Sequence, residues 1–329
     1  MINRRIAIFA LVVVLVFTSI AVGRKFVSKK IAKNDDEIEI ISSDDDIMNI
    51  VEEEGMRKTV LYFQNSEGFL VPVMRRIPWE EGIAKLALKN MIDTPELREV
   101  LGPTGLLPII PSGTEINGMS VNPDTGICKV DFNEEILNKE SLKDEENLIK
   151  GVVYTLTEFP AVKGVQIFVN GEEVSVLKNG TKLDKSLTRE DINLLGSDDD
   201  GRSKIVVYFK GQSEGDFEYF IPVTIPTLAP VANVYTALDL LFEGPPEDSG
   251  LYSDIPRSVN FKGVEIKEST AYVDVNLGDE NMLTREATLN EIVKDIGLTL
   301  SQFSEIESVE LLVDGEVINT SIPTFANEY

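Results

Sequence analysis

Two long stretches of the chain share one pattern of hydrophobic and polar positions. They cover residues 148–174 and 292–317. In each stretch, apolar residues at helical spacing precede a run rich in β-branched residues and then an Asn-Gly or Asp-Gly dipeptide. Five positions match at an offset of 144 residues: Leu148, Leu156, Phe159, Val165 and Gly171 correspond to Ile292, Leu300, Phe303, Val309 and Gly315. A repeat of this size indicates that a whole domain has been duplicated.

Each copy begins with two short runs of β-branched and aromatic residues, which predict a β-hairpin. Pro72 and Pro222 stand at matching places in the second runs. Because proline cannot donate to a neighbouring strand, we expect these strands to lie at a sheet edge or to end early. An amphipathic helix should follow, and in the second copy its core stripe is Val231, Val234, Tyr235, Leu238, Leu241 and Phe242.

Two more strands, a longer helix and a final strand complete each copy. The strands are expected at 117–121, 127–132 and 165–169, and at 263–266, 271–275 and 309–313, with helices over 144–159 and 289–303. Thr288 and Glu291 have the spacing of a capping box at the start of the second helix. The order is β-β-α-β-β-α-β with a short returning strand, which predicts an α+β fold with two helices on one face of a mixed sheet.

The pattern divides the chain into six segments. We expect an N-terminal membrane anchor or signal segment with basic flanks over 1–33, an acidic linker over 34–57, a first domain over 58–180, a second acidic linker over 181–203, a second domain over 204–320 and a C-terminal tail over 321–329. The consecutive aspartates of the linkers lack the spacing of a calcium-binding loop, so a solvated spacer is the favoured interpretation.

The N-terminal segment contains 17 residues without a charge, Ile6 to Val22. Two interpretations stay open, a secretory signal cleaved after Ala21 and a retained single-pass transmembrane helix, and the length of the run favours retention. Basic residues are more numerous after the run than before it, which opposes the positive-inside rule. We nevertheless expect the body to be extracytoplasmic, and to be secreted if the segment is cleaved.

The amino-acid composition excludes several kinds of catalytic and binding site. Without the seven basic residues that precede Asp35, 24 basic residues stand against 56 acidic ones, so the body carries a net charge of −32 and should repel nucleic acid. Histidine is absent, which excludes Ser-His-Asp and Cys-His catalysis and imidazole zinc sites. Cys128 is the only cysteine, so an intrachain disulfide and a lipoprotein anchor near the apolar run are both excluded.

Few side chains are candidates for a site. Asp131 and Asp274 occupy equivalent strand positions, but no partner carboxylate repeats with them, so the favoured interpretation is a bond to a nearby backbone amide rather than glycosidase chemistry. Cys128 corresponds to Ala271 and is expected in the core. The loops over 102–111 and 244–256 are rich in glycine and proline and are candidate contact surfaces. We assign no catalytic, cofactor-binding or metal-binding residue.

Longer phrases give the chain a family resemblance. The first copy reads VLYF, LVPV, LGP, GLLPIIPSGTEI, ICKVDFNEEI and VVYTLTEFPAVKGVQIFVNGEEV, and it resembles the GerMN domain. The second copy, with IVVYF, YFIPV, FEGPP, AYVDVNLGDE and LTLSQFSEIESVELLVDGEV, resembles a more diverged GerMN domain. The match runs from Lys58 to Asn319. It implies domains similar to the ring-building motifs of secretion systems.

The resemblance also implies a function. Tandem GerMN domains are typical of sporulation and germination proteins of endospore-forming bacteria, which implies a non-enzymatic envelope protein acting by ring-type homo- or hetero-oligomeric assembly with protein partners in the cell or forespore envelope. Family members are often lipoproteins, whereas this chain lacks the required cysteine. An extracytoplasmic accessory module of a sensor-kinase system is the alternative, and a cell-wall hydrolase using Asp131 and Asp274 is a third.

Overall fold

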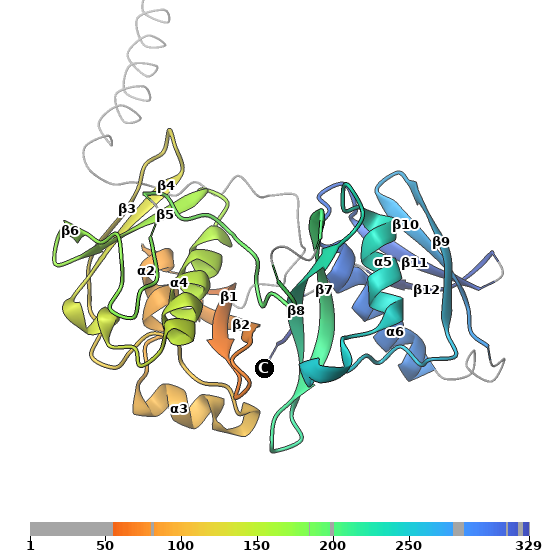
Figure 1. Ribbon diagram of the computed structural model, residues 1–329, viewed down its shortest axis with the longest axis horizontal. Coiled ribbons are helices and arrows are strands. Elements are labelled where there is room, and N and C mark those ends of the chain that lie inside the picture. Colours follow the sequence, from red (N-terminus) through yellow and green to blue (C-terminus); the bar gives the residue numbers. More distant parts are fainter. Residues whose placement is uncertain are drawn as a thin grey trace, which may run out of the picture. The chain divides into compact units, whose positions relative to one another are not determined.

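The computed structural model describes residues 55–79, 82–183, 185–197, 201–278, 286–313, 315–321 and 325–328. The predicted anchor or signal segment and all but the end of the first acidic linker lie outside these residues. Within the described residues no helix is both long enough and apolar enough to cross a membrane. The described ranges contain both copies of the repeat (Figure 1).

The first repeat follows the predicted element order with one addition. Its elements are β1 (Met56–Gln64), β2 (Leu70–Pro78), α2 (Ile83–Lys89), α3 (Pro95–Leu101), β3 (Ile116–Val121), β4 (Ile127–Phe132), α4 (Leu142–Thr157), β5 (Gly164–Val169) and β6 (Glu172–Glu173), with 3-10 turns at Gly102–Thr104 and Glu134–Leu137. The unexpected element is α3. Thr94 caps it, because its side chain accepts a hydrogen bond from the Leu97 amide, and Pro95 is its first residue.

The second repeat contains β7 (Ser203–Gln212), β8 (Glu218–Thr227), α5 (Val234–Glu243), a 3-10 turn (Glu247–Ser249), β9 (Asn260–Lys267), β10 (Thr270–Asn276), α6 (Glu286–Leu300), β11 (Ser308–Val313) and β12 (Glu316–Ser321). Three details differ from expectation. Val231 precedes α5 and is 73% exposed, so it is not a core residue. Tyr235 lies on α5 but is 54% exposed, so it is not a core residue either. Thr288 lies inside α6, which begins at Glu286, so it does not cap that helix.

Each repeat contains two sheets rather than the single mixed sheet that was predicted. The hairpins β1-β2 and β7-β8 are separate two-stranded sheets, and the remaining strands form four-stranded sheets in the orders β3-β4-β5-β6 and β9-β10-β11-β12. In the four-stranded sheets the β4-β5 and β10-β11 pairs are parallel, because α4 or α6 connects them as a crossover, and the other pairs are antiparallel. The fold is α+β, as expected.

The prolines of the hairpins lie at a sheet edge but do not end their strands. Pro72 pairs with Tyr62 and Pro222 pairs with Tyr208, and both strands continue beyond them. In a two-stranded sheet each strand has one unpaired side, which is where a proline without an amide hydrogen costs least. The edge prediction is confirmed, and the alternative of an early strand end is wrong.

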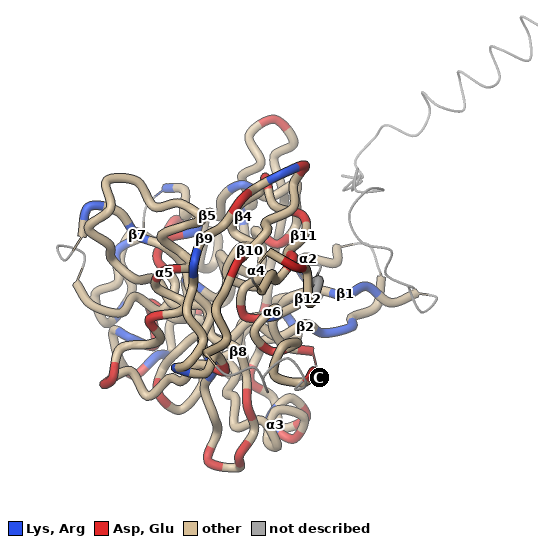
Figure 2. Tube along the Cα trace, turned by 90° about the vertical axis from the view of Figure 1, so that its right-hand side faces the viewer, with Lys and Arg blue, Asp and Glu red and all other residues tan. Residues whose placement is uncertain are grey.

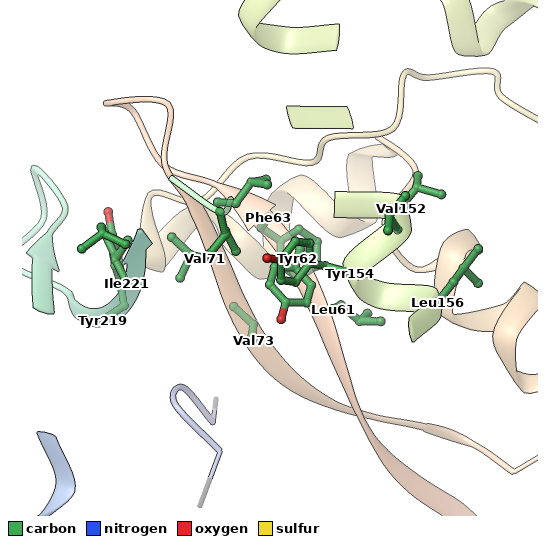
Figure 3. Packing of buried hydrophobic residues seen from close by; sticks show 14 of the residues in the cluster. Leu61, Tyr62, Phe63, Val71, Val73, Val152, Tyr154, Leu156, Tyr219 and Ile221 are labelled. Atoms are coloured by element: carbon green, nitrogen blue, oxygen red, sulfur yellow. The ribbon is translucent and has the colours of Figure 1, made fainter. Parts of the chain in front are cut away.

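The core of the first repeat lies between α4 and the hairpin. Figure 3 shows Tyr62 of β1 beside Tyr154 of α4, and their ring centroids lie 5.3 Å apart. Leu61 and Phe63 of β1 and Val152 and Leu156 of α4 are nearly or fully buried. Apolar side chains of the mixed sheets complete the two cores; Cys128, Val130, Phe132, Ala271, Val273 and Val275 are all fully buried. The predicted buried face of these strands is therefore confirmed, and burial of this apolar area is the main stabilising term.

Charged residues lie mostly at the surface. Figure 2 shows Asp and Glu spread over helices and loops of the described chain, with Lys and Arg among them. A smaller number of ionisable groups is buried, and Lys210, Glu145 and Asp295 are each less than a tenth exposed. Buried charges need a partner or lose their charge, so these residues are where chemistry or regulation should be sought.

Candidate functional site

The contact between the two repeats is built on the unpaired sides of β2 and β8. Asn193, which follows the first repeat, is 4% exposed. Its Oδ1 accepts a hydrogen bond from the Leu70 amide at 2.8 Å, and its Nδ2 donates to the Leu70 carbonyl at 2.8 Å. The same Nδ2 donates across to the Pro222 carbonyl at 2.8 Å. One side chain thus satisfies backbone groups of both hairpins.

Asn327, which follows the second repeat, does the same in reverse. Its Oδ1 accepts from the Phe220 amide at 2.8 Å, and its Nδ2 donates to the Phe220 carbonyl at 2.9 Å and to the Pro72 carbonyl at 2.7 Å. Phe220 stands two residues before Pro222, just as Leu70 stands two residues before Pro72. The two asparagines therefore make equivalent contacts with exchanged strands, which is the pattern of an isologous interface.

Backbone hydrogen bonds strengthen this seam, the contact formed by β2, β8, Asn193 and Asn327. The Thr224 amide donates to the Ile192 carbonyl at 2.9 Å, and the Met74 amide donates to the Asn327 carbonyl at 2.7 Å. The segment after each repeat thus pairs with the hairpin of the other repeat. Open strand edges are hazards for aggregation, and here they are covered within the chain.

One glycine-rich loop also joins the contact. Gly105 has a φ of 69°, and a Cβ at this position would lie 2.9 Å from the Ser213 Cβ in the turn between β7 and β8. The counterpart Gly250 has a φ of 72° with no such neighbour within 4 Å. The first of the two predicted contact loops therefore contacts the second repeat of the same chain.

The two candidate carboxylates differ in their contacts. Asp131 Oδ1 accepts a hydrogen bond from the Gly171 amide at 2.8 Å, so it holds the tight turn between β5 and β6 as the favoured interpretation predicted. Asp274 Oδ1 is buried, and among the described residues it has no hydrogen-bond partner. Asp131 and Asp274 belong to the separate sheets of the two repeats, so neither supplies the other with a catalytic partner.

Cys128 is a core residue. It is fully buried on β4, and burial raises the pKa of its thiol to about 12. A thiol with such a pKa is almost entirely protonated at neutral pH, and a protonated thiol is a poor nucleophile. In the described chain no group of three or more Cys, Asp or Glu side chains could hold a metal ion.

The sequence interpretation missed a charged cluster in the second repeat. Lys210 of β7 forms ion pairs with Asp254, with Glu291 Oε2 at 3.0 Å and with Glu218 Oε2 at 3.4 Å. Burial lowers the pKa of Lys210, but the hydrogen bonds and charges of Asp254 and Glu291 outweigh that effect and raise it. Glu291, which the capping pattern placed at a helix start, instead binds this ammonium.

A buried carboxyl group lies behind Lys210. Asp295 is 2% exposed, and its Oδ1 has no hydrogen-bond partner among the described residues. Burial raises its pKa well above the ordinary value, and the charges of Asp254 and Glu291 raise it further, against the opposing effects of Lys210 and Lys294. The only hint in the sequence was Asp295 itself, an acid between the apolar residues Val293 and Ile296 of α6 and next to Lys294.

The first repeat holds neutral residues at the same places. Asn147 corresponds to Glu291 and donates through Nδ2 to Gln64 Oε1 at 2.8 Å, where Gln64 corresponds to Lys210. Gly151 corresponds to Asp295, and a Cβ there would lie 2.1 Å from the Cδ1 of Ile109, the counterpart of Asp254. The duplication has thus kept a neutral pair and a close apolar contact in one copy and placed ionisable groups in the other.

Known proteins share both the sequence and the fold. The family described as "Germane: Sporulation and spore germination" matches residues 60–175 and 206–319, which are the two repeats. The chain belongs to this family. It is 29% identical over 271 residues to "Spore germination protein GerM" of Bacillus subtilis (strain 168), covering 79% of this chain and 72% of that protein.

A solved structure supports the tandem arrangement of GerMN domains. The "Tandem GerMN domains of the sporulation protein GerM from Bacillus subtilis" match with a TM-score of 0.70 and 26% identity, covering 83% of this chain and 99% of that one. The predicted resemblance to tandem GerMN domains is therefore confirmed, and the chain is a GerM homologue related to sporulation and germination.

Proposed function

We propose that this GerMN protein is a membrane-anchored envelope protein that acts in sporulation or germination by assembling into a ring-type oligomer, with itself or with other envelope proteins. A role in sporulation or germination is supported by the family and by the name of the Bacillus subtilis relative, a spore germination protein. The anchor is supported by the uncharged run from Ile6 to Val22, which has the length of a membrane span. The body is then extracytoplasmic.

The observation that carries the assembly proposal is the seam. Asn193 and Asn327 join each hairpin to the segment that follows the other repeat. The two described repeats would therefore bind a partner as one unit and not as two independent domains. The four-stranded sheets keep terminal strands, β3 and β6 in the first and β9 and β12 in the second, whose outer sides are not paired within these sheets. Such strands can accept a neighbouring subunit.

We propose no catalytic activity. Asp131 accepts a hydrogen bond from the Gly171 amide, and histidine is absent from the sequence. The buried thiol of Cys128 is not suited to nucleophilic attack. The acidic body favours protein partners in the envelope over nucleic acid, since like charges repel.

The test uses the full chain reconstituted in detergent or nanodiscs and measures its mass by light scattering over a wide range of concentrations. We expect oligomers, formed alone or after addition of solubilised envelope proteins. An Ile266→Lys variant places a charge on the terminal strand β9, where Ile266 is 44% exposed, and should shift the population to smaller species if that edge is used. Leu142→Lys, on α4 and 48% exposed, is the matched control.

A chain that remains monomeric under every condition would overturn the assembly proposal. The cellular role is tested separately, by following expression of the gene during sporulation and scoring spore formation and germination after deletion. Peptidoglycan release by the wild type that is lost in an Asp131→Asn variant would instead favour the hydrolase.

A further inference from the structure

The charged cluster of the second repeat binds a loop through Lys210. Residues 250–256, which we call the strap, connect the 3-10 turn to β9. The Lys210 amide donates to the Tyr252 carbonyl at 2.8 Å, and the Tyr252 amide donates to the Lys210 carbonyl at 2.9 Å. The Lys210 side chain reaches the same strap through its ion pair with Asp254. Lys210 thus holds the strap by backbone and by charge.

The cluster contains more carboxyl groups than ammonium groups can neutralise. Lys210 forms ion pairs with Asp254 on the strap, Glu291 on α6 and Glu218 on β8. The buried Asp295 of α6 also feels the charge of Lys210. Lys294 is the second ammonium near Asp295, and it also lies 4.5 Å from the centre of the Phe220 ring. If all these acids were ionised, buried like charges would oppose one another, so the arrangement favours retention of a proton.

The elements that pack against α6 bring few other charges to Asp295. They are α5, β7, β11 and β12. Their ionisable residues are Tyr235, Asp239, Glu243, Lys204, Tyr208, Lys210, Glu310 and Glu316, and of these only Lys210 acts strongly on the Asp295 carboxyl. The strap supplies Asp254, and α6 itself supplies Glu291 and Lys294. The strap is therefore the neighbouring segment whose own charge opposes ionisation of Asp295.

We propose that the strap is a pH-sensitive element, held against β7 and α6 by the ion pairs of Lys210 with Asp254 and Glu291 while the buried Asp295 carboxyl keeps its proton, and loosened when that proton is lost. Loss of the proton adds a buried negative charge on α6, and the charges of Asp254 and Glu291 oppose it. Lys210 pairs with both Asp254 and Glu291, but it does not hydrogen-bond to the buried Asp295 oxygen that lacks a partner. This electrostatic repulsion decreases when the strap, which carries Asp254, moves away from α6.

The direction of the pH dependence follows from the raised pKa values of two aspartates. Burial raises the pKa of both Asp295 and Asp254 in the folded state. Above the ordinary aspartate value of about 3.9, the folded protein with a closed strap therefore binds more protons than the open or unfolded chain. The stability of the closed strap is largest below that value and falls as pH rises through the raised pKa.

The first repeat provides a control within the same molecule. Its equivalent loop, residues 105–111, is held to Gln64 by the same backbone bridge through Leu107. The groups around that bridge are Gln64, Asn147, Ile109 and Gly151, and none of them titrates. A pH effect confined to the strap would therefore arise from the cluster and not from general loosening of the fold.

Hydrogen exchange of the full chain between pH 5 and 8 tests the proposal. After correction for the intrinsic effect of pH on exchange, protection of 250–256 should fall about tenfold or more across the range, whereas protection of 105–111 should stay constant. An Asp295→Asn variant should lose the pH dependence and keep the strap closed. This change lies in the second repeat and alters none of the residues around the control loop.

A second variant keeps the test decisive if Asp295→Asn folds poorly. Glu291→Gln removes a partly exposed carboxylate of the same cluster and should reduce the pH dependence without abolishing the closed strap. Protection of 250–256 that is independent of pH in the wild type would overturn the proposal, and so would an unchanged pH dependence in the Asp295→Asn chain or, should that variant not fold, in the Glu291→Gln chain.

Discussion

Asn193 and Asn327 make the same three hydrogen bonds with exchanged partners, each binding one hairpin strand through both its amide and its carbonyl and reaching one proline carbonyl of the other. A proline presents a carbonyl but no amide hydrogen, so at that position a donor is all that the strand edge requires. The side-chain amide of asparagine supplies that donor, and its oxygen remains for the neighbouring backbone amide.

Asn193→Ala should destabilise the described unit by about 1–3 kcal/mol, because the Leu70 amide and two carbonyls lose their partner in a buried place. Asn327→Ala should cost a similar amount. Urea unfolding measures both effects. Asn90→Ala is the control, since Asn90 also donates to a carbonyl but is exposed. Equal stability of Asn193→Ala and Asn90→Ala would show that the seam contributes little.

Gly151→Ala should destabilise the first repeat by about 1–3 kcal/mol through overpacking, because the new Cβ would lie 2.1 Å from Ile109 Cδ1. Thermal or denaturant unfolding provides the measurement. Gly102→Ala is the control, as Gly102 has an ordinary helical backbone and nothing within 4 Å of an added Cβ. Combining Gly151→Ala with Ile109→Val removes the clashing methyl and should restore part of the loss. If the double variant is no more stable than Gly151→Ala alone, the loss of stability does not arise from the contact with Ile109.

Gly105→Ala should cost more stability than Gly250→Ala. Both positions have positive φ and therefore the same backbone strain. Only Gly105 also faces a neighbour, the Ser213 Cβ at 2.9 Å, so the difference between the two variants in denaturant unfolding reports the contact between the repeats. Replacing Ser213 by glycine in the Gly105→Ala chain should narrow that difference, and equal costs for both single variants would argue against a close contact.

Cys128 should resist thiol reagents in the native protein at pH 7 to 9 and react fully after unfolding. Its burial excludes the reagent, and its raised pKa of about 12 keeps the thiolate population very small over that range. Colour release from an aromatic disulfide reagent, with and without denaturant, gives the measurement. Rapid labelling under native conditions would mean that β4 opens readily.

The alternation of side chains was sufficient to predict the buried face of the four-stranded sheets, although not their separation from the hairpins. Cys128, Val130 and Phe132 recur as three apolar residues 143 positions later, and because side chains alternate along a strand, their burial on one face followed directly. Helices α4 and α6 were predicted from the regular spacing of their apolar residues. Val231 was misplaced because helical spacing continues one turn beyond the point where Asn233 caps α5.

The parts that sequence reasoning missed depend on contacts between distant residues. Nothing local marks Asn193 or Asn327, since each acts on strands of both repeats and the separations reach 255 residues. Glu291 matched a local capping pattern, yet a tertiary contact with Lys210 determines its role. Asp295 could have been noticed as an acid in a helix stripe, but only the packing around it shows that it is buried and without a hydrogen bond.

The seam can be completed only after the end of the chain has been synthesised. The hairpin of the first repeat is made early, yet the Met74 amide and the Pro72 carbonyl receive their partners from Asn327, which follows Pro72 by 255 residues. Until that residue emerges, this part of the β2 edge is unpaired during synthesis, when open strands are most prone to wrong pairing. The edge that the finished molecule covers is therefore a natural place for a chaperone, or for a neighbouring chain, to bind before folding is complete.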